Sequence, residues 1–252
     1  MGPGACFPKS QVPRPKSPPV FDHIPRNLAE VRDRIANAAG RAGRKPEDVR
    51  LIAVSKTQPI EAVRAAADAG QIDFGENKVQ EALQKIAQSA DNSLRWHLIG
   101  HLQSNKARKA AAAVGAIHAI DSVDLLKRVD QAAGEAGRSI DVLIQVDLAL
   151  EDTKHGAPVG DVAAIVTAAE ACTAARLIGL MLLPPLAENP ADARPWFHRL
   201  RELRDELVAN GAAADRLREL SMGMSHDFEV AIAEGSTMVR VGTAIFGERH
   251  YT

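Results

Sequence analysis

The chain has 252 residues, enough for one α/β barrel with a large buried core. Its 31 lysines and arginines nearly balance its 32 aspartates and glutamates, so its surface offers no bulk attraction for nucleic acid or a membrane. Its two cysteines are too few for a disulfide framework or a zinc site, which fits a cytoplasmic protein.

The N-terminal segment differs from the rest of the chain. Seven of the 14 prolines lie in positions 1–25, where they remove backbone donors and disfavour helix interiors. We therefore expect a disordered tail over 1–26 and one folded unit over 27–252. Deleting such a tail is expected to leave the melting temperature nearly unchanged.

The remaining sequence alternates between helical stretches and short apolar runs. Asn27 is placed to cap a first helix, with Glu30 three residues on. Apolar, β-branched runs then predict strands at 51–55, 72–77, 96–100, 116–121, 141–147, 177–183, 219–224 and 237–247. A helical stretch follows each of the first seven strands, and Ser225 is placed to cap the last of these helices.

Strands that are apolar on both faces and separated by helices indicate a parallel sheet. Eight such units predict a closed (β/α)8 barrel of the TIM type that takes up the whole folded unit. The alternative is an open, doubly wound sheet, which would want a glycine-rich phosphate turn after the first strand. The sequence at that point, AVSKTQP (53–59), offers none.

Several polar residues stand where the predicted strands end, which is where an α/β barrel places its working groups. They are Lys56, Asn77, His101, Asp121, Asp147, Ser221 and Thr243. Polar residues at strand ends also serve as turn formers and helix caps, so each position needs its own argument.

Lys56 ends an apolar stretch, LIAVSK (51–56). If burial opposes the charge of this lysine, its pKa falls and its amine becomes a nucleophile that forms an imine with an aldehyde. An ordinary solvated lysine after a strand is the alternative.

Arg240 alternates with two valines in MVRVG (238–242), so it faces the opposite side of its strand from them. If the valines pack outward against helices, Arg240 points into the barrel and needs an acceptor there. That acceptor is either a barrel carboxylate in a structural ion pair or a ligand.

Gly242 and Thr243 follow directly and suit a phosphate site. A glycine lets the backbone approach a ligand, and a hydroxyl with N–H groups holds phosphate. The matching end of the seventh strand, SMGMS (221–225), lies where barrels often bind phosphate.

Other catalytic motifs fit less well. His97 and His101 are four residues apart but lack the glutamate of a zinc protease motif, and SMGMS is not a hydrolase elbow. The sequence has no Walker loop, and nothing singles out two carboxylates for glycoside hydrolysis.

Five segments resemble the pyridoxal phosphate homeostasis protein family, whose members have an alanine-racemase-like N-terminal barrel. The segments are AVSKTQP (53–59), DFGENKVQE (73–81), WHLIGHLQSNKARKA (96–110), GLMLLPP (179–185) and LSMGMSHDFEVAIAEGSTMVRVGTAIFGER (220–249). The resemblance runs from about residue 27 to 251.

The resemblance implies that Lys56 holds pyridoxal 5′-phosphate as a Schiff base. It also implies five further cofactor-binding residues: Ser221, Gly242 and Thr243 at the phosphate, Arg240 at the pyridine nitrogen, and Asn77 near the cofactor.

Three features depart from the family pattern. The family often has an aromatic residue where Lys78 stands and an acidic one where His226 stands, and the segment 148–156 loses the family's usual asparagine and small residues. These departures affect the rim of the expected site and leave Lys56 and Arg240 unchanged.

An arginine at the pyridine nitrogen disfavours its protonation, so the ring is a weak electron sink and transamination is not expected. A racemase needs acid–base groups on both faces of the substrate carbon, and the related racemases take a tyrosine from a second, all-β domain. The sequence has one tyrosine, Tyr251, at its end, and no residues left for such a domain. We therefore expect a monomeric cofactor-binding protein without efficient turnover.

The resemblance implies a carrier or buffer of pyridoxal phosphate that acts in vitamin B6 and amino-acid homeostasis, with apo pyridoxal enzymes as candidate partners. The alternative is a pyridoxal phosphate-dependent racemase or lyase of low activity, with His101, Asp121 or His155 as its base.

Overall fold

The structure is a computed structural model that describes residues 21–149 and 155–248. Its barrel strands are β1 (Arg50–Val54), β2 (Asp73–Glu76), β3 (Arg95–Leu98), β4 (Ala116–Ile120), β5 (Ile140–Asp147), β7 (Ala175–Leu182), β8 (Glu219–Met224) and β9 (Met238–Val241). Each pairs in parallel with the next, and β9 pairs with β1, so the sheet closes on itself. A two-residue strand, β6 (Ala157–Pro158), lies beside β5. The closed barrel is confirmed, and the open sheet is excluded.

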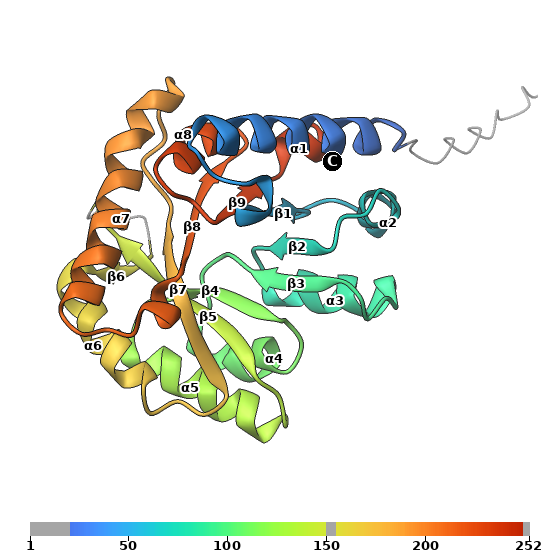
Figure 1. Cartoon of the computed structure of the whole chain (residues 1–252). Helices are drawn as coiled ribbons and strands as arrows, with labels where there is room; N and C mark the ends of the chain where they lie inside the picture. The colour runs from blue at the N-terminus through green and yellow to red at the C-terminus, as the bar shows by residue number, and fades with distance from the viewer. Residues whose placement is uncertain (1–20, 150–154, 249–252) are drawn as a thin grey trace, which may run out of the picture.

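Helices surround the strands in an outer layer (Figure 1). They are α1 (His23–Arg41), α2 (Ile60–Asp68), α3 (Val79–Ser89), α4 (Ala107–Ala111), α5 (Val123–Glu135), α6 (Val159–Ala169), α7 (Arg194–Ala209), α8 (Phe228–Ala233) and α9 (Thr243–Phe246). Across the described ranges, every helix is too short or too polar to cross a membrane.

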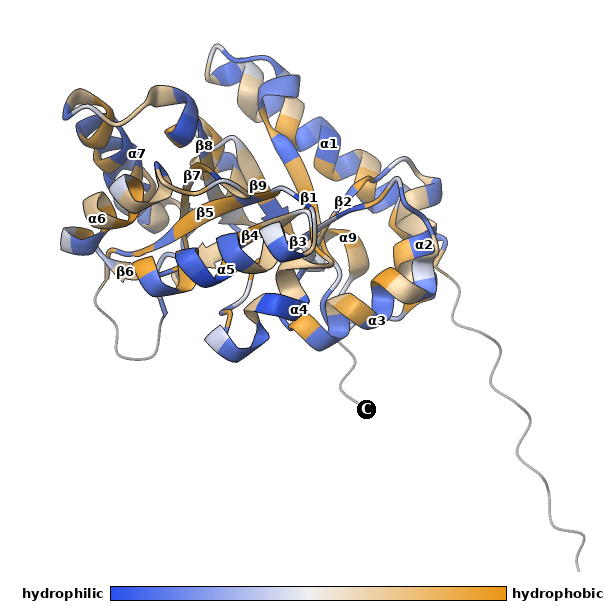
Figure 2. Ribbon diagram, turned by 90° about the horizontal axis from the view of Figure 1, so that it is seen from below, coloured by the Kyte–Doolittle hydropathy of each residue, from blue (hydrophilic) through white to orange (hydrophobic). Residues whose placement is uncertain are grey.

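The helices form and dock because their apolar residues recur at helical spacing. In α1, Leu28, Val31 and Ile35 are buried, while most of the residues between them are exposed to water. Figure 2 shows the resulting pattern, with helices banded blue and orange around mainly orange strands. The outer core therefore lies between the two layers.

The N-terminal boundary differs from the prediction. Helix α1 begins at His23, and residues 23–26, which the sequence placed in the tail, form its first turn. Ile24 is fully buried there, and Pro25 is tolerated because first-turn N–H groups have no partner within the helix. Asn27 does not cap the helix, because its amide donates to the carbonyl of Ile245 at 3.1 Å. The rest of the predicted tail, 1–20, lies outside the described residues.

The C-terminal strand is also shorter than predicted. Strand β9 ends at Val241, and the chain then turns into helix α9 instead of continuing as a strand to 247. Ile245 and Phe246 of this helix are both buried within the outer core. The eighth barrel strand is therefore also followed by a helix.

Candidate functional site

A cavity of about 400 Å³ opens where the barrel strands end. Its walls come from the carboxyl-terminal parts of β1, β5, β8 and β9 and from residues that follow β1, β2, β3, β5, β7, β8 and β9. Five of the six predicted site residues line it: Lys56, Asn77, Arg240, Gly242 and Thr243. Because a closed barrel places these strand ends in one ring, residues far apart in the sequence share one cavity.

Lys56 follows β1 and is partly buried at the cavity wall. Its turn is closed by the N–H of Gln58, which donates to the carbonyl of Ser55 at 2.9 Å. Thr57 adopts a positive φ of 65°, which a non-glycine residue rarely does. Such a backbone persists only when its surroundings hold it.

Those surroundings are a buried ionic cluster that the sequence did not reveal, here named the Lys85 cluster: Ser55, Glu76, Glu81 and Lys85. The Nζ atom of Lys85 donates to the carbonyl of Ser55 at 2.6 Å and to Glu76 and Glu81 at 2.7 and 2.8 Å. The backbone N–H of Thr57 donates to Glu81. The cluster therefore binds the backbone of the turn on both sides of Lys56, at Ser55 and at Thr57.

Within this cluster Glu76 is fully buried. Burial raises the pKa of its carboxyl, although Lys85 and the hydroxyl of Ser55 act in the opposite direction. Its second oxygen, Oε2, has no hydrogen-bond partner in the part of the chain that the structure describes. Lys85 compensates the charge of Glu76, because burying an unpaired carboxylate costs free energy of folding.

Asn77 follows β2, and its backbone lies directly beside Gly100. A Cβ atom on Gly100 would lie 2.4 Å from the carbonyl oxygen of Asn77. Since real Cβ atoms do not approach backbone oxygen so closely, only glycine permits this contact between the ends of β2 and β3.

Arg240 points into the barrel, as its alternation with two valines predicted, and is only 3% exposed. Its guanidinium donates to Ser221 Oγ at 2.7 Å and to the carbonyl of Leu182 at 2.8 Å. Both of these acceptors are uncharged, so a structural ion pair with a barrel carboxylate does not account for this arginine among the described residues. Burial lowers the pKa of Arg240 to about 10, with Asp227 opposing, so the group stays charged at neutral pH.

Backbone and hydroxyl groups converge at one corner of the cavity. The hydroxyl of Ser225 accepts from the N–H of Gly242 at 3.1 Å and from that of Ala244 at 3.4 Å. Thr243 is exposed beside them. A Cβ atom on Gly242 would lie 3.1 Å from the carbonyl of Val54, so glycine suits this close approach. An anion could take the place of the Ser225 oxygen as acceptor.

Ser225 therefore does not cap α8, although the sequence predicted that it would. Helix α8 has Asp227 at its N-cap position, and the side chain of Ser225 turns toward the end of β9 instead. The reason is local, since the amides after β9 lack strand partners and the Ser225 hydroxyl supplies one.

Ser221 does not reach the cavity. It is fully buried in β8, where it accepts from Arg240 and contacts His118 Nδ1 at 2.9 Å. A direct phosphate contact for Ser221 remains a prediction, and the geometry favours Ser225 for that contact.

The chain is similar to known proteins over most of its length. Residues 26–250 match the family described as alanine racemase, N-terminal domain. The pyridoxal phosphate homeostasis protein of Aquifex aeolicus is 43% identical over 224 residues, which cover 89% of this chain and 97% of the relative. That of Pseudomonas aeruginosa is 44% identical over 229 residues, with 90% and 96% covered. This chain belongs to the pyridoxal phosphate homeostasis protein family.

A solved structure of the family gives the same fold. PipY of Synechococcus elongatus, described with pyridoxal phosphate bound, is 42% identical with a TM-score of 0.79, and the match covers 89% of this chain and all of PipY. The predicted resemblance, barrel and family are confirmed.

In this member of the pyridoxal phosphate homeostasis protein family, two of the three residues considered as a base, His101 and His155, lie at the rim of the cavity, and the third, Asp121, lies beside His101. The rings of His101 and His155 stack at 3.7 Å, and His101 Nδ1 lies 3.7 Å from an oxygen of Asp121. Burial and the neighbouring His155 lower the pKa of His101, with Asp121 opposing. His226, another rim residue, pairs with the carbonyl of Glu188 at 2.9 Å. Much of the altered loop, 150–154, lies outside the described residues.

Proposed function

We propose that this cavity binds pyridoxal 5′-phosphate and that Lys56 holds it as a Schiff base. The observation that carries the proposal is the convergence, in one cavity of about 400 Å³, of a lysine, a buried arginine and the amide corner at Gly242. The aldehyde of the cofactor needs the amine of a lysine, its ring nitrogen needs a donor such as the arginine, and its phosphate needs the backbone amides. PipY, a relative described with this cofactor bound, supports the same assignment.

Each group has a distinct role. The amine of Lys56 would condense with the aldehyde and release water. The amides of Gly242 and Ala244, with the hydroxyls of Thr243 and Ser225, would hold the phosphate. Arg240 would donate to the ring nitrogen and, because it stays charged, would keep that nitrogen unprotonated. Bound pyridoxal phosphate supplies an electron sink, and an unprotonated ring nitrogen makes that sink weaker.

We therefore assign a homeostatic role, in which the protein carries or buffers the cofactor in the cytoplasm, as a monomer, and passes it to apo pyridoxal enzymes. The names of its relatives, pyridoxal phosphate homeostasis proteins, fit this role. The stacked pair His101 and His155 favours one alternative, a racemase or lyase of low activity, because it places a base at the rim.

Borohydride reduction tests the Schiff base. The reduced protein should gain the mass of one reduced phosphopyridoxyl group, mapped to the peptide that contains Lys56, and Lys56→Ala should lose it. Lys78→Ala, a change at an exposed lysine beside Asn77, is the matched control and should keep the label. A label that survives in Lys56→Ala would refute the assignment. Exchange of the α-proton of alanine in D2O at an enzyme-like rate would refute the carrier role.

A further inference from the structure

A continuous line of polar side chains runs through the barrel interior, here named the interior chain: Asp73, His97, His118, Ser221 and Arg240. Four contacts link them, at 2.8 Å from Asp73 Oδ1 to His97 Nε2, 3.0 Å between the two histidines, 2.9 Å from His118 Nδ1 to Ser221 Oγ, and 2.7 Å from Ser221 Oγ to Arg240. The members come from five strands, so only the closed barrel brings them together.

The interior chain joins the two ends of the barrel. Asp73 is the first residue of β2, at the amino ends of the strands, and its side chain is 15% exposed. Arg240 lines the cavity at the opposite end. The members between them are at most 1% exposed, so they must satisfy their hydrogen bonds with one another.

The two ends fix the direction of every bond between them. A guanidinium only donates, so Ser221 Oγ accepts from Arg240, and an ionised carboxylate only accepts, so His97 Nε2 donates to Asp73. Burial works against ionisation of Asp73, yet the hydrogen bond from His97 and the charge of Arg95 lower the pKa of its carboxyl overall. Asp73 is therefore an acceptor at neutral pH.

The two histidines then have one arrangement each. Burial lowers the pKa of His97 and lowers that of His118 further, so both rings are neutral. With its Nε2 donating to Asp73, His97 accepts at Nδ1 from His118 Nε2, and His118 Nδ1 accepts the hydroxyl proton of Ser221. The hydroxyl of Ser221 is thereby turned away from Arg240 and offers it a lone pair.

We propose that Asp73, acting through the interior chain, fixes the hydrogen bond from Arg240 to Ser221 and so aims an N–H group of Arg240 that is bonded neither to Ser221 nor to Leu182 at the ring nitrogen of the cofactor. Asp73 is a positioning residue for the site at the far end of the barrel. This inference rests on the proposed function, because it assumes that the ring nitrogen lies at Arg240.

The first test needs no cofactor. In the native protein, ¹⁵N NMR of the imidazole rings should show His97 and His118 neutral and protonated on Nε2. Protonation of His118 on Nδ1 would overturn the proposal, whether or not the protein binds pyridoxal phosphate. This readout separates failure of the interior chain from failure of the proposed function.

The second test uses variants that do not touch the cavity. Asp73→Leu removes the terminal acceptor, so the absorption maximum of bound pyridoxal phosphate should shift and its affinity should fall roughly two- to tenfold, the loss of one ordinary hydrogen bond. Asp73→Asn keeps an acceptor oxygen without the charge, so its effect should be smaller and should rescue part of the loss.

Asp141→Asn is the matched control. Asp141 lies near the start of β5, at the same end of the barrel, and pairs with Arg176 at 2.7 Å as Asp73 pairs with Arg95 at 3.4 Å. Asp141 is not a member of the interior chain. The absorption spectrum of the Asp141→Asn variant and its affinity for pyridoxal phosphate should therefore match those of the native protein. Equal spectra and affinities for Asp73→Leu and Asp141→Asn would overturn the proposal.

Discussion

The Nζ atom of Lys85 lies 2.6 Å from the carbonyl oxygen of Ser55, one residue before Lys56. Lys85 is 5% exposed, so its charge is compensated inside the protein by Glu76 and Glu81. This lysine therefore acts as the support of the turn that carries the proposed Schiff-base lysine, without lining the cavity.

Replacing Lys85 with methionine should destabilise the protein by about 3–5 kcal/mol, because it leaves the carboxylate of Glu76 buried without a cation. Urea unfolding measures this loss, and Lys127→Met, a change at an exposed lysine of α5, should stay within about 0.5 kcal/mol. The double variant Lys85→Met, Glu76→Gln should recover part of the loss. If Lys85→Met and Lys127→Met unfold alike, the Lys85 cluster has no such role.

Gly100→Ala should disturb the cavity wall at Asn77. The added Cβ would lie 2.4 Å from the carbonyl of Asn77, so the two strand ends must separate, at a cost of about 1–3 kcal/mol. Pyridoxal phosphate binding should weaken together with stability. Gly160→Ala, where a Cβ meets nothing within 4 Å in the first turn of α6, should leave binding unchanged and should not destabilise the protein. Unaltered binding by Gly100→Ala would remove Asn77 from the site.

The sequence was sufficient to predict the barrel and most of the named residues that line the cavity. Apolar runs separated by helical stretches determine parallel pairing, and closure then brings the strand ends together whatever their order in the chain. Lys56 and Arg240 could be found for this reason, because each stands at or near the end of a recognisable strand.

Contacts that depend on packing could not be found in the same way. Lys85 lies three residues after the buried Ala82, on the inner face of α3, and this spacing was the one available signal. A lysine at such a position is usually solvated, so its burial depends on Glu76, which comes from a different element. That Ser225 lines the cavity and Ser221 does not likewise depends on how the strand ends pack, which strand periodicity does not specify.

Acid should weaken the fold through the interior histidines. Unfolded histidine takes up a proton below about pH 6.5, whereas burial lowers the pKa of both His97 and His118 in the folded protein. Between the lowered and the ordinary pKa the unfolded state binds more protons, so the free energy of unfolding should fall as pH drops below about 6.5 and stay constant with respect to these groups above it.

Urea unfolding at about pH 7.5 and about pH 5.5 measures this slope. His118→Gln removes one of the two groups and should reduce the difference between the two pH values, and His226→Gln, a change at an exposed histidine, should preserve it. A native slope in His118→Gln would mean that its ring titrates normally.

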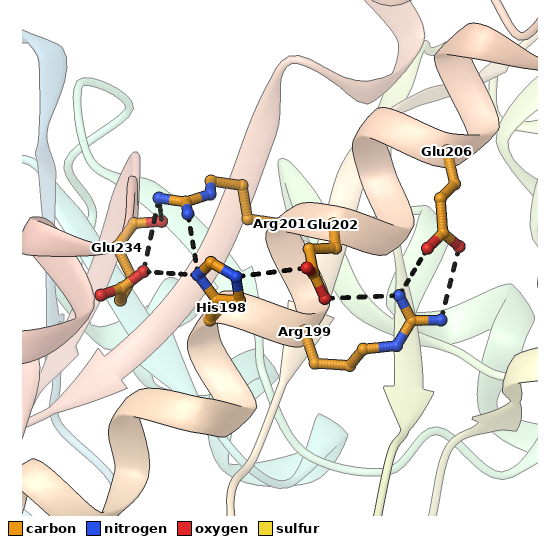
Figure 3. Close-up of polar contacts among 6 residues, drawn as sticks. All are labelled: His198, Arg199, Arg201, Glu202, Glu206 and Glu234. Atoms are coloured by element: carbon orange, nitrogen blue, oxygen red, sulfur yellow. Dashed lines mark hydrogen bonds and ion pairs between the residues drawn. The ribbon is translucent and has the colours of Figure 1, made fainter.

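Glu234 follows α8 and joins it to α7, because it contacts Arg194 at 2.6 Å, His198 at 3.2 Å and Arg201 at 3.4 Å. Figure 3 shows its contacts with His198 and Arg201. These contacts lower the pKa of Glu234 against the opposing effect of burial. Because the carboxylate is largely buried, Glu234→Gln should cost about 1–2 kcal/mol, more than an exposed pair.

Glu206→Gln, a change in α7, is its matched control. Glu206 pairs with Arg199 at 2.7 Å, but both side chains are exposed, so its loss should cost less than about 1 kcal/mol. Equal melting temperatures for the two variants would show that the extra partners of Glu234 add nothing.

Removing residues 1–26 should destabilise the protein more than removing residues 1–20, contrary to the expectation from the sequence. The difference lies in the first turn of α1, where Ile24 is fully buried and worth about 1.5–3 kcal/mol. His23 Nε2 also lies 3.3 Å from the carbonyl of Phe246 in α9. The longer deletion should therefore also weaken binding of inorganic phosphate at Thr243, since α9 loses a support. Ile24→Ala in the full chain isolates the packing part, and identical unfolding of the two truncated proteins would show that this turn does not anchor α1.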